Sequence, residues 1–185
     1  MITDRQGKAD EGLRIVQTLL MDSQRVIDLG CGKRHHTKHL PNTVWVDIDP
    51  NHADDPRVLV MDVREAPHVF RRMHFDCAVL TDIIEHFPKD DGFKLIREVQ
   101  PLADRVIIFT PLGEMWVDKD REPESPHHHR CGWMPFELEA LGFKTWVWPK
   151  MHNFNGSIFG AFYAWKWIQG GTPTAKEISE LSGIS

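Results

Sequence analysis

Residues 26–32 read VIDLGCG, and this stretch predicts a strand followed by a sharp turn. The first four residues form a short, mostly apolar run with a β-branched start, which is typical of a buried strand. Gly30 and Gly32 follow directly, where a strand must turn sharply and a ligand can approach the backbone. Asp28 lies near the end of this predicted strand. We therefore expect its carboxylate at the carboxyl edge of a sheet, where doubly wound folds bind ligands.

A second acid follows one strand–helix unit later. Asp47 comes directly after residues 43–46, which read TVWV and predict another strand. The separation of about twenty residues is that of a ribose-binding acid at the end of the next strand. A Gly-x-Gly by itself is equally compatible with an ordinary strand–turn–helix that has incidental acids nearby. Two acids and two strands in this arrangement favour a nucleoside-binding site.

Three segments resemble the motifs of class I S-adenosylmethionine-dependent methyltransferases, of the kind classed as methyltransferase types 11 and 23. They are DLGCG at residues 28–32, VDIDP at 46–50, and FDCAVL at 75–80 running into IEH at 84–86. The resemblance covers residues 12–168. It implies an α/β fold with a Rossmann-like doubly wound sheet, mostly parallel with an antiparallel last strand, and helices on both faces. We therefore expect a single S-adenosylmethionine-binding domain over residues 1–168 and a C-terminal tail over residues 169–185.

The resemblance also implies where the cofactor, S-adenosylmethionine, binds. In the family the first acid, here Asp28, lies near the methionine amino group, the glycines let the backbone pass under the cofactor, and the second acid, here Asp47, bridges the ribose hydroxyls. A residue pair, here Asp62 and Val63, contacts the adenine, with a helix-capping role for Asp62 as the alternative. Residues after the fourth strand face the same edge of the sheet. The expected cofactor-binding residues are Asp28, Gly30, Cys31, Gly32, Asp47, Ile48, Asp62, Val63, Thr81 and Asp82.

Glu85 and His86 follow the predicted fourth strand and place an acid beside an imidazole. The imidazole pKa is intrinsically close to neutrality, so His86 is a candidate general base for a hydroxyl or amine acceptor. The alternative is that both residues shape this turn, and that catalysis works by holding the acceptor against the methyl group. We expect Glu85 and His86 to be the catalytic residues.

Residues 114–130 are polar, rich in charge and interrupted by proline, without a clear period. Long loops in compact domains are usually functional or disordered, and we expect this one over the acceptor side of the site. The expected substrate-binding residues in it are Trp116, His127, His129 and Arg130. Residues 127–129 are consecutive histidines, which do not readily turn toward one ion from a strand or a helix. We therefore predict no metal site.

Residues 33–40 read KRHHTKHL and are predicted to form a helix after the glycine turn. The family usually has a small residue soon after the position of Gly32, whereas this chain has Lys33 and Arg34. Helix N-termini and basic side chains both favour anions. The segment is therefore either a solvated helix face or a site for an acidic substrate or a phosphate.

The remaining elements are predicted from hydrophobic periodicity and turn residues. An unbroken apolar run predicts that the strand at residues 105–110 is buried on both faces. Helices are expected at residues 11–21, 65–72, 91–99 and 134–142, further strands at 57–61, 143–148 and 158–167, and a loop at 150–157.

The composition is that of an ordinary globular protein, with 185 residues of which 41% are hydrophobic and 26% charged. A net charge of -5 argues against a broadly basic nucleic-acid-binding protein. No apolar run approaches the roughly 18 residues of a membrane span, and residues 1–11 lack a signal-peptide apolar region. The three cysteines have no paired spacing, which indicates reduced thiols. We expect a cytoplasmic protein that does not bind membranes.

These observations predict an enzyme, an S-adenosylmethionine-dependent methyltransferase that acts on an oxygen, nitrogen or carbon nucleophile. The chain has no Asn-Pro-Pro-Tyr-like motif after the fourth strand and no added domain to hold a macromolecule, which favours a small-molecule acceptor over nucleic acid. One alternative is a non-catalytic adenosyl-binding subunit. The other, an NAD(P)-dependent oxidoreductase, needs Gly-x-Gly-x-x-Gly or Ala, and the third position here is His35. We make no prediction of the oligomeric state.

Overall fold

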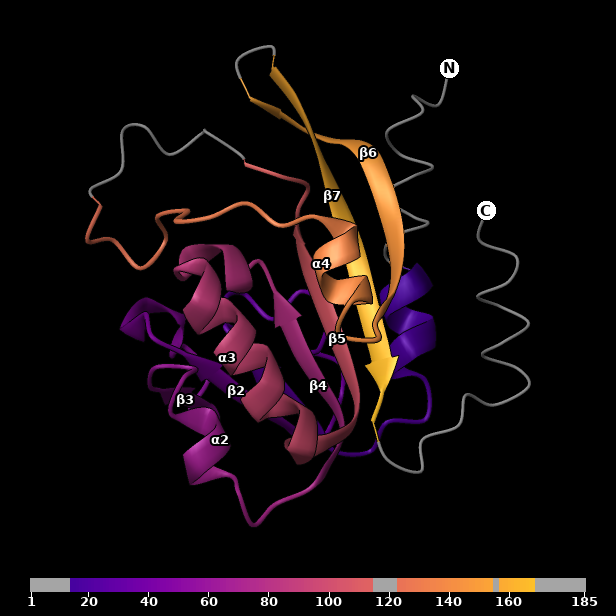
Figure 1. Cartoon of the computed structure of the whole chain (residues 1–185). Helices are drawn as coiled ribbons and strands as arrows, with labels where there is room; N and C mark the ends of the chain where they lie inside the picture. The colour runs from indigo at the N-terminus through magenta and orange to yellow at the C-terminus, as the bar shows by residue number, and fades with distance from the viewer. Residues whose placement is uncertain (1–13, 115–122, 155–156, 169–185) are drawn as a thin grey trace, which may run out of the picture.

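The computed structural model describes residues 14–114, 123–154 and 157–168, and a seven-stranded sheet runs through them (Figure 1). The strand order across the sheet is β3-β2-β1-β4-β5-β7-β6. The strands are β1 (Val26–Leu29), β2 (Thr43–Asp47), β3 (Val58–Val60), β4 (Phe75–Thr81), β5 (Ala103–Pro111), β6 (Lys144–Phe154) and β7 (Ser157–Trp167).

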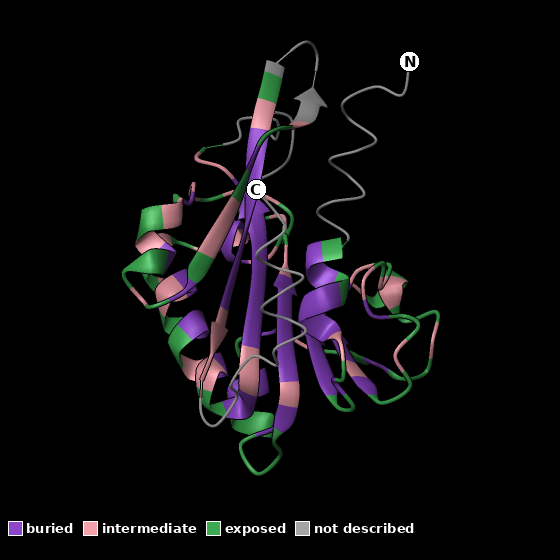
Figure 2. Ribbon diagram, turned by 90° about the vertical axis from the view of Figure 1, so that its right-hand side faces the viewer, coloured by how far each residue is buried: buried purple, intermediate pink, exposed green. Residues whose placement is uncertain are grey.

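The first five strands are parallel wherever they pair, while β7 runs antiparallel to both of its neighbours, β5 and β6. All four residues of β1 and residues 106–111 of β5 are buried. Parallel strands that are covered on both faces carry nearly continuous apolar runs, as these do. Figure 2 shows the buried residues concentrated along the central strands. The predicted doubly wound sheet with an antiparallel last strand is confirmed.

Helices cover both faces of the sheet, as predicted. The helices α2 (Ala66–Val69), α3 (Lys89–Val99) and α4 (Pro135–Glu139) share a core with Ala78 and Leu80 of β4. Helical residues 14–20 lie on the opposite face, where they share a second core with Cys77 and Val79. Alternate β4 residues serve the two cores because successive side chains of a strand point to opposite faces. Short 3-10 turns occur at η1 (Pro50–His52), η2 (Ile84–His86) and η3 (Gln100–Leu102).

The prediction of a helix at residues 33–40 is wrong, because these residues form turns. Arg34 has a φ of +56°, in the left-handed region that interrupts a right-handed helix. The Thr37 hydroxyl is also turned inward, where it donates to the carboxylate of Asp28. This segment therefore closes over the end of β1 and presents no helical face.

The prediction of a loop at residues 150–157 is also wrong for residues 150–154 and 157, which belong to strands. Strand β6 continues to Phe154, which pairs with Ser157 at the start of β7, and the pairing register shifts between Trp148 and His152. Pro149 lies within this shifted segment, and it has no N–H group to donate to a regular ladder. The helices predicted at residues 65–72 and 134–142 are present in shorter form, as α2 and α4.

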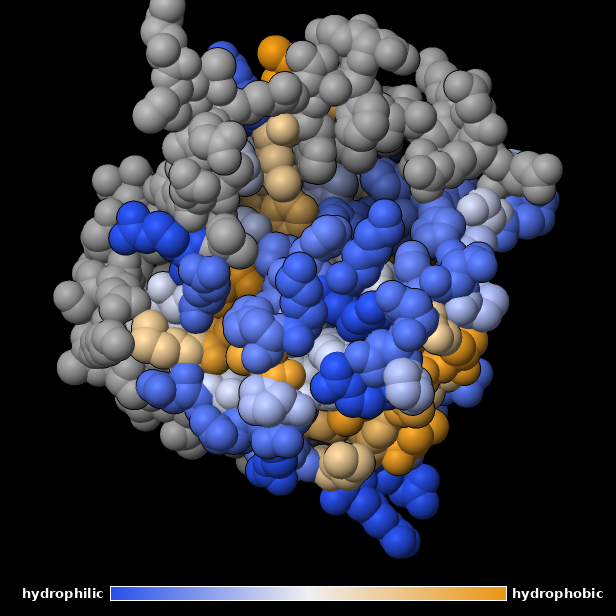
Figure 3. Space-filling view, turned by 180° about the vertical axis from the view of Figure 1, so that it is seen from behind, coloured by the Kyte–Doolittle hydropathy of each residue, from blue (hydrophilic) through white to orange (hydrophobic). Residues whose placement is uncertain are grey.

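On the face seen in Figure 3, the described surface is mainly hydrophilic, with smaller hydrophobic areas between the polar side chains. Within residues 14–114, 123–154 and 157–168, no helix combines the length and the apolar character needed to cross a bilayer. The tail predicted at residues 169–185 lies outside the described residues.

Candidate functional site

The turn after β1 depends on its two glycines. Gly30 has a φ of +74° and Gly32 a φ of +47°, a region that other residues rarely adopt. A Cβ atom at Gly30 would lie 1.7 Å from Cδ1 of Ile83, whereas one at Gly32 would meet nothing within 4 Å. The amides of Gly30 and Cys31 donate to the Val46 carbonyl at 2.8 and 3.0 Å. The turn is thus anchored to the end of β2, and its Gly32 side faces open space.

Asp47, the last residue of β2, contacts this turn directly. Its Oδ2 accepts a hydrogen bond from the Gly32 amide at 2.8 Å, and its Oδ1 accepts one from the Asp49 amide at 2.9 Å. The Nδ1 atom of His52 lies 3.2 Å from Oδ1. The glycine turn and the second acid, which the sequence analysis identified in separate segments, therefore lie together at the carboxyl edge of the sheet.

Asp28 is buried beneath the turn. The Thr37 hydroxyl donates to its Oδ2 at 2.5 Å, and the Trp45 indole donates to that hydroxyl at 2.9 Å. Its Oδ1 is buried and has no hydrogen-bond partner within the described part of the chain. Burial raises the pKa of Asp28 to about 7, because desolvation disfavours the ionised carboxylate. An unpaired buried acceptor costs free energy, so a donor group of a ligand would be stabilised here.

A pocket of about 560 Å³ opens beside the turn, at the carboxyl ends of β1, β2 and β4. This volume lies in the ordinary range for small-ligand sites. The predicted cofactor-binding residues that line it are Gly30, Cys31, Gly32, Asp47, Ile48, Asp62, Val63, Thr81 and Asp82. Asp28 is not among the lining residues. The structure thus brings together all but one of the positions predicted to hold the cofactor.

Asp62 lines the pocket as half of an ion pair. The guanidinium of Arg64 donates to its carboxylate, with the closest contact at 2.5 Å, and this hydrogen bonding lowers the pKa of Asp62. The carboxylate also accepts a hydrogen bond from the Arg64 amide at 2.9 Å. The N-cap of α2 is Glu65, so Asp62 caps the turn that leads to the helix and not the helix itself.

The short 3-10 turn η2 carries Glu85 and His86. His86 lines the pocket, whereas the Glu85 side chain is buried behind it with 2% of its surface exposed. One carboxylate oxygen of Glu85 accepts a hydrogen bond from the Thr110 hydroxyl of β5 at 2.9 Å. Burial and, secondarily, the nearby charge of Asp82 raise the pKa of Glu85 well above its ordinary value.

The loop before α4 is hydrogen-bonded to η2. The amides of Arg130 and Cys131 donate to the Glu85 carbonyl at 2.8 and 3.3 Å. The guanidinium of Arg130 donates to the carbonyls of His86 and Pro123, each at 2.8 Å. Arg130 lines the pocket, as its predicted role in substrate binding requires, but its guanidinium also holds this loop in shape.

The loop brings histidines against His86. The ring centroid of His129 lies 4.9 Å from that of His86, and the centroid of His127 lies 6.4 Å from it. Both residues line the pocket, as expected for the substrate-binding residues of this loop. Trp116, the remaining predicted substrate-binding residue, lies outside the described residues.

Several pocket residues were not identified by the sequence analysis. Phe87 and Pro88 directly follow the Glu85–His86 pair and could have been found from that position alone. The others carry no local signal, because only the fold brings them to the edge of the sheet. The additional lining residues are His52, Arg64, Ile83, Phe87, Pro88, Glu124 and Pro126.

No protein-family model matches the chain, and no curated protein matches it. The structure is similar to that of an S-adenosylmethionine-dependent methyltransferase from Archaeoglobus fulgidus, with 17% identity, a TM-score of 0.60, and coverage of 86% of this chain and 94% of that one. The methyltransferase domain of bacterial CtHen1 matches with 18% identity, a TM-score of 0.53, and coverage of 84% and 98%.

A third similar structure is magnesium protoporphyrin IX methyltransferase from Synechocystis PCC 6803 with bound S-adenosylhomocysteine, with 17% identity, a TM-score of 0.56, and coverage of 88% of this chain and 85% of that one. At these identities the similarity establishes the arrangement of the backbone. The chain has the fold of the class I S-adenosylmethionine-dependent methyltransferases.

Proposed function

We propose that this protein is an S-adenosylmethionine-dependent methyltransferase. The observation that carries the proposal is the bond between the Gly32 amide and the Asp47 carboxylate at the mouth of a 560 Å³ pocket. This bond joins a glycine turn and an acid at the carboxyl ends of adjacent strands, which is where nucleotide-like ligands bind in doubly wound folds. The shared fold with methyltransferases supports the same assignment.

The residues present fit the cofactor. The open space beside Gly32 admits a ligand against the backbone. The unpartnered Oδ1 of Asp28 lies beneath the same turn and suits a cationic amino group. Ile48 is an exposed apolar side chain at the pocket wall and offers a flat surface to a purine. Asp47 would accept from the ribose hydroxyls.

The bound cofactor supplies an activated methyl group on a sulfonium. The protein therefore has to bind the cofactor, orient the acceptor and exclude water. His86, Arg130 and His129 line the same pocket as Asp47, and we expect them to hold the acceptor. An imidazole there can accept the proton of a hydroxyl or amine acceptor as the methyl group is transferred. Proximity alone would also accelerate the reaction if the acceptor needs no base.

A small molecule is the acceptor that we propose. The pocket has the volume of a small-ligand site, and the net charge of -5 gives no general attraction for nucleic acid. The similar structures do not agree on one acceptor, since they include a small RNA methyltransferase as well as the magnesium protoporphyrin IX enzyme. A panel of hydroxyl, amine and carboxylate compounds, with a short RNA alongside, separates these classes by the methyl label each one gains.

Calorimetric titration with S-adenosylhomocysteine tests the cofactor, with NAD titrated in parallel. We expect saturable heat with the first ligand and none with the second. The reverse result would identify an oxidoreductase and overturn the proposal. Binding without transfer to any acceptor would instead support the adenosyl-binding subunit.

A further inference from the structure

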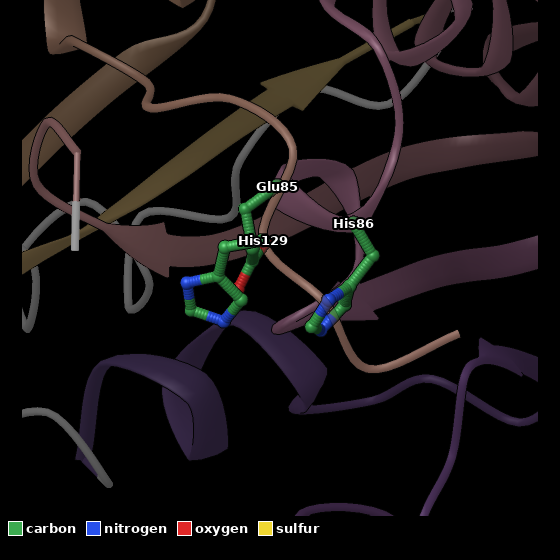
Figure 4. A group of neighbouring side chains, drawn as sticks. All are labelled: Glu85, His86 and His129. Carbon is green, nitrogen blue, oxygen red and sulfur yellow. The ribbon is translucent and has the colours of Figure 1, made fainter. Parts of the chain in front are cut away.

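We propose that Glu85, His86 and His129 together bind one divalent transition-metal ion at the wall of the pocket. Each residue offers one ligand atom, and the three atoms lie within 4.8 Å of one another. Figure 4 shows the side chains reaching from two segments, η2 and the loop before α4, toward a common space. No metal site was predicted from the sequence, because consecutive histidines do not readily turn toward one ion and no local pattern joins His129 to η2.

The distances suit a single ion after a small adjustment. Zinc binds histidine nitrogen and carboxylate oxygen at about 2.0–2.2 Å, so two ligand atoms of a tetrahedral ion lie about 3.3–3.6 Å apart. Side-chain rotations that close the cluster by about 1–1.5 Å would meet this spacing. His86 and His129 are half-buried, which leaves them accessible to an ion that enters through the pocket.

The donor set selects the class of metal. Two imidazoles and one carboxylate suit zinc, cobalt, iron(II) and similar ions, whereas magnesium and calcium prefer sites made only of oxygen. Three protein ligands leave coordination positions open, as in catalytic metal sites. Because His86 and His129 line the pocket, the open positions would face it.

The buried carboxylate of Glu85 is the second observation that points to an ion. Its Oε2 accepts from Thr110, but its Oε1 is buried and has no hydrogen-bond partner within the described part of the chain. Glu85 is 2% exposed, so this oxygen has no access to bulk water. A buried oxygen without a partner is costly, and a cation beside it would remove that cost.

The surroundings also orient the ligands. His86 Nδ1 lies 3.3 Å from the His128 carbonyl, and donation to that oxygen fixes the tautomer in which Nε2 carries the lone pair. The Thr110 hydroxyl orients the carboxylate of Glu85. The amides of Arg130 and Cys131 hold the loop of His129 against the Glu85 carbonyl. Such outer-shell contacts are typical of metal sites.

The ion's role in the reaction rests on the proposed function. An oxygen of the acceptor would occupy an open coordination position, which would lower its pKa and fix it near the methyl group. His86 would then be a metal ligand and would not serve as the base. Metal binding itself requires neither a cofactor nor an acceptor.

Direct titration tests the site. The full chain is treated with EDTA, freed of chelator, and titrated with Zn²⁺ by calorimetry and with Co²⁺ by visible absorption. We expect saturation at one ion per chain, with cobalt absorption bands of a nitrogen- and oxygen-ligated site. If neither ion binds with saturation, the proposal is overturned.

Three variants locate the binding. We expect His129→Ala and Glu85→Gln to weaken Zn²⁺ binding by more than the roughly 10–100-fold that loss of an outer-shell partner costs. His128→Ala is the matched control, since it removes a neighbouring imidazole of the same loop that is not in the cluster. The Zn²⁺ affinity of His128→Ala should equal that of the unaltered chain. An equal loss of Zn²⁺ affinity in His128→Ala and His129→Ala would contradict the site.

Circular dichroism of the metal-free variants establishes that they are folded. Glu85 is buried, so His129→Ala in the half-exposed loop decides the question if Glu85→Gln does not fold. The same samples are titrated with S-adenosylhomocysteine. Metal binding without S-adenosylhomocysteine binding would reject the proposed function alone, and the opposite result would reject the metal site alone.

Discussion

Two parts of the pocket lining are built in different ways. At the glycine turn, the contact between Gly32 and Asp47 joins residues 15 positions apart, and both oxygens of Asp47 have partners. Around η2, the contact between His86 and His128 joins residues 42 positions apart. The first part is assembled within one local supersecondary unit, whereas the second depends on a distant loop. Each part has one buried carboxylate oxygen, of Asp28 and of Glu85, without a partner within the described residues.

The largest expected effect separates the two parts of the lining by function. We expect His86→Ala to lower turnover by about 100-fold or more, because a base or an acceptor-positioning group is lost. The affinity for S-adenosylhomocysteine should change little, since His86 is not among the residues expected to hold the cofactor. Initial rates with an acceptor from the panel, together with calorimetry, measure both quantities. Unchanged turnover would remove His86 from the catalytic residues.

Gly30→Ala should destabilise the glycine turn by about 2–4 kcal/mol. A Cβ atom there meets Ile83 at 1.7 Å, and the residue has a φ of +74°. Gly142→Ala is the matched control, because it has a similar φ of +83° but its Cβ would make only ordinary contacts at 3.5 Å. Urea unfolding measures both free energies. Equal losses in the two variants would show that the contact with Ile83 contributes nothing.

Asp28 should make stability depend on pH. Its pKa is about 7 in the folded protein, against 3.8 for an aspartate free of such an environment, so between these values the folded state holds a proton that the unfolded state releases. Stability should therefore fall as the pH rises toward 7 and then level off. Asp47 strengthens the upward shift of the pKa, while the Thr37 hydrogen bond and Arg34 oppose it.

Between pH 5 and pH 8 the unaltered chain should lose about 2–3 kcal/mol more unfolding free energy than Asp28→Asn, which cannot titrate. Denaturant unfolding at both pH values measures this difference. Parallel pH profiles for the two proteins would contradict the raised pKa of Asp28.

Asp47→Ala should weaken S-adenosylhomocysteine binding by about 1–3 kcal/mol, through loss of charged hydrogen bonds to the ribose. Asp104→Asn is a suitable control, because this half-buried acid pairs with His74 and does not line the pocket. Calorimetry compares the two affinities. If both variants bind as tightly as the unaltered chain, Asp47 does not hold the ribose.

The smallest expected effect is that of Arg130→Ala. Its guanidinium donates to the carbonyls of His86 and Pro123, but the residue is exposed and water can replace these bonds. We expect a loss of about 0.5–1 kcal/mol in stability, with faster hydrogen exchange of the amides near His129. Unchanged exchange there would show that the backbone bonds to Glu85 suffice to hold the loop.

Much of the fold could be predicted because it depends on local patterns. The apolar runs of β1, β4 and β5 predicted strands, and the resemblance to class I methyltransferases implied that they form a doubly wound sheet, which the structure confirms. The helix expected at residues 33–40 was wrong because the inward hydrogen bond of Thr37 and the left-handed Arg34 outweigh helix propensity. Propensity is a weak guide where tertiary contacts compete with it.

The sequence by itself determined the glycine turn, the acids at the strand ends and the strands between them. These features depend on steric limits at each residue and on hydrophobic periodicity, both of which are local. Only the tertiary structure decided that Asp28 is buried under Thr37 and that Glu85, His86 and His129 converge. Such contacts join distant segments, and their geometry depends on how the loop before α4 bonds to η2 once the sheet has formed.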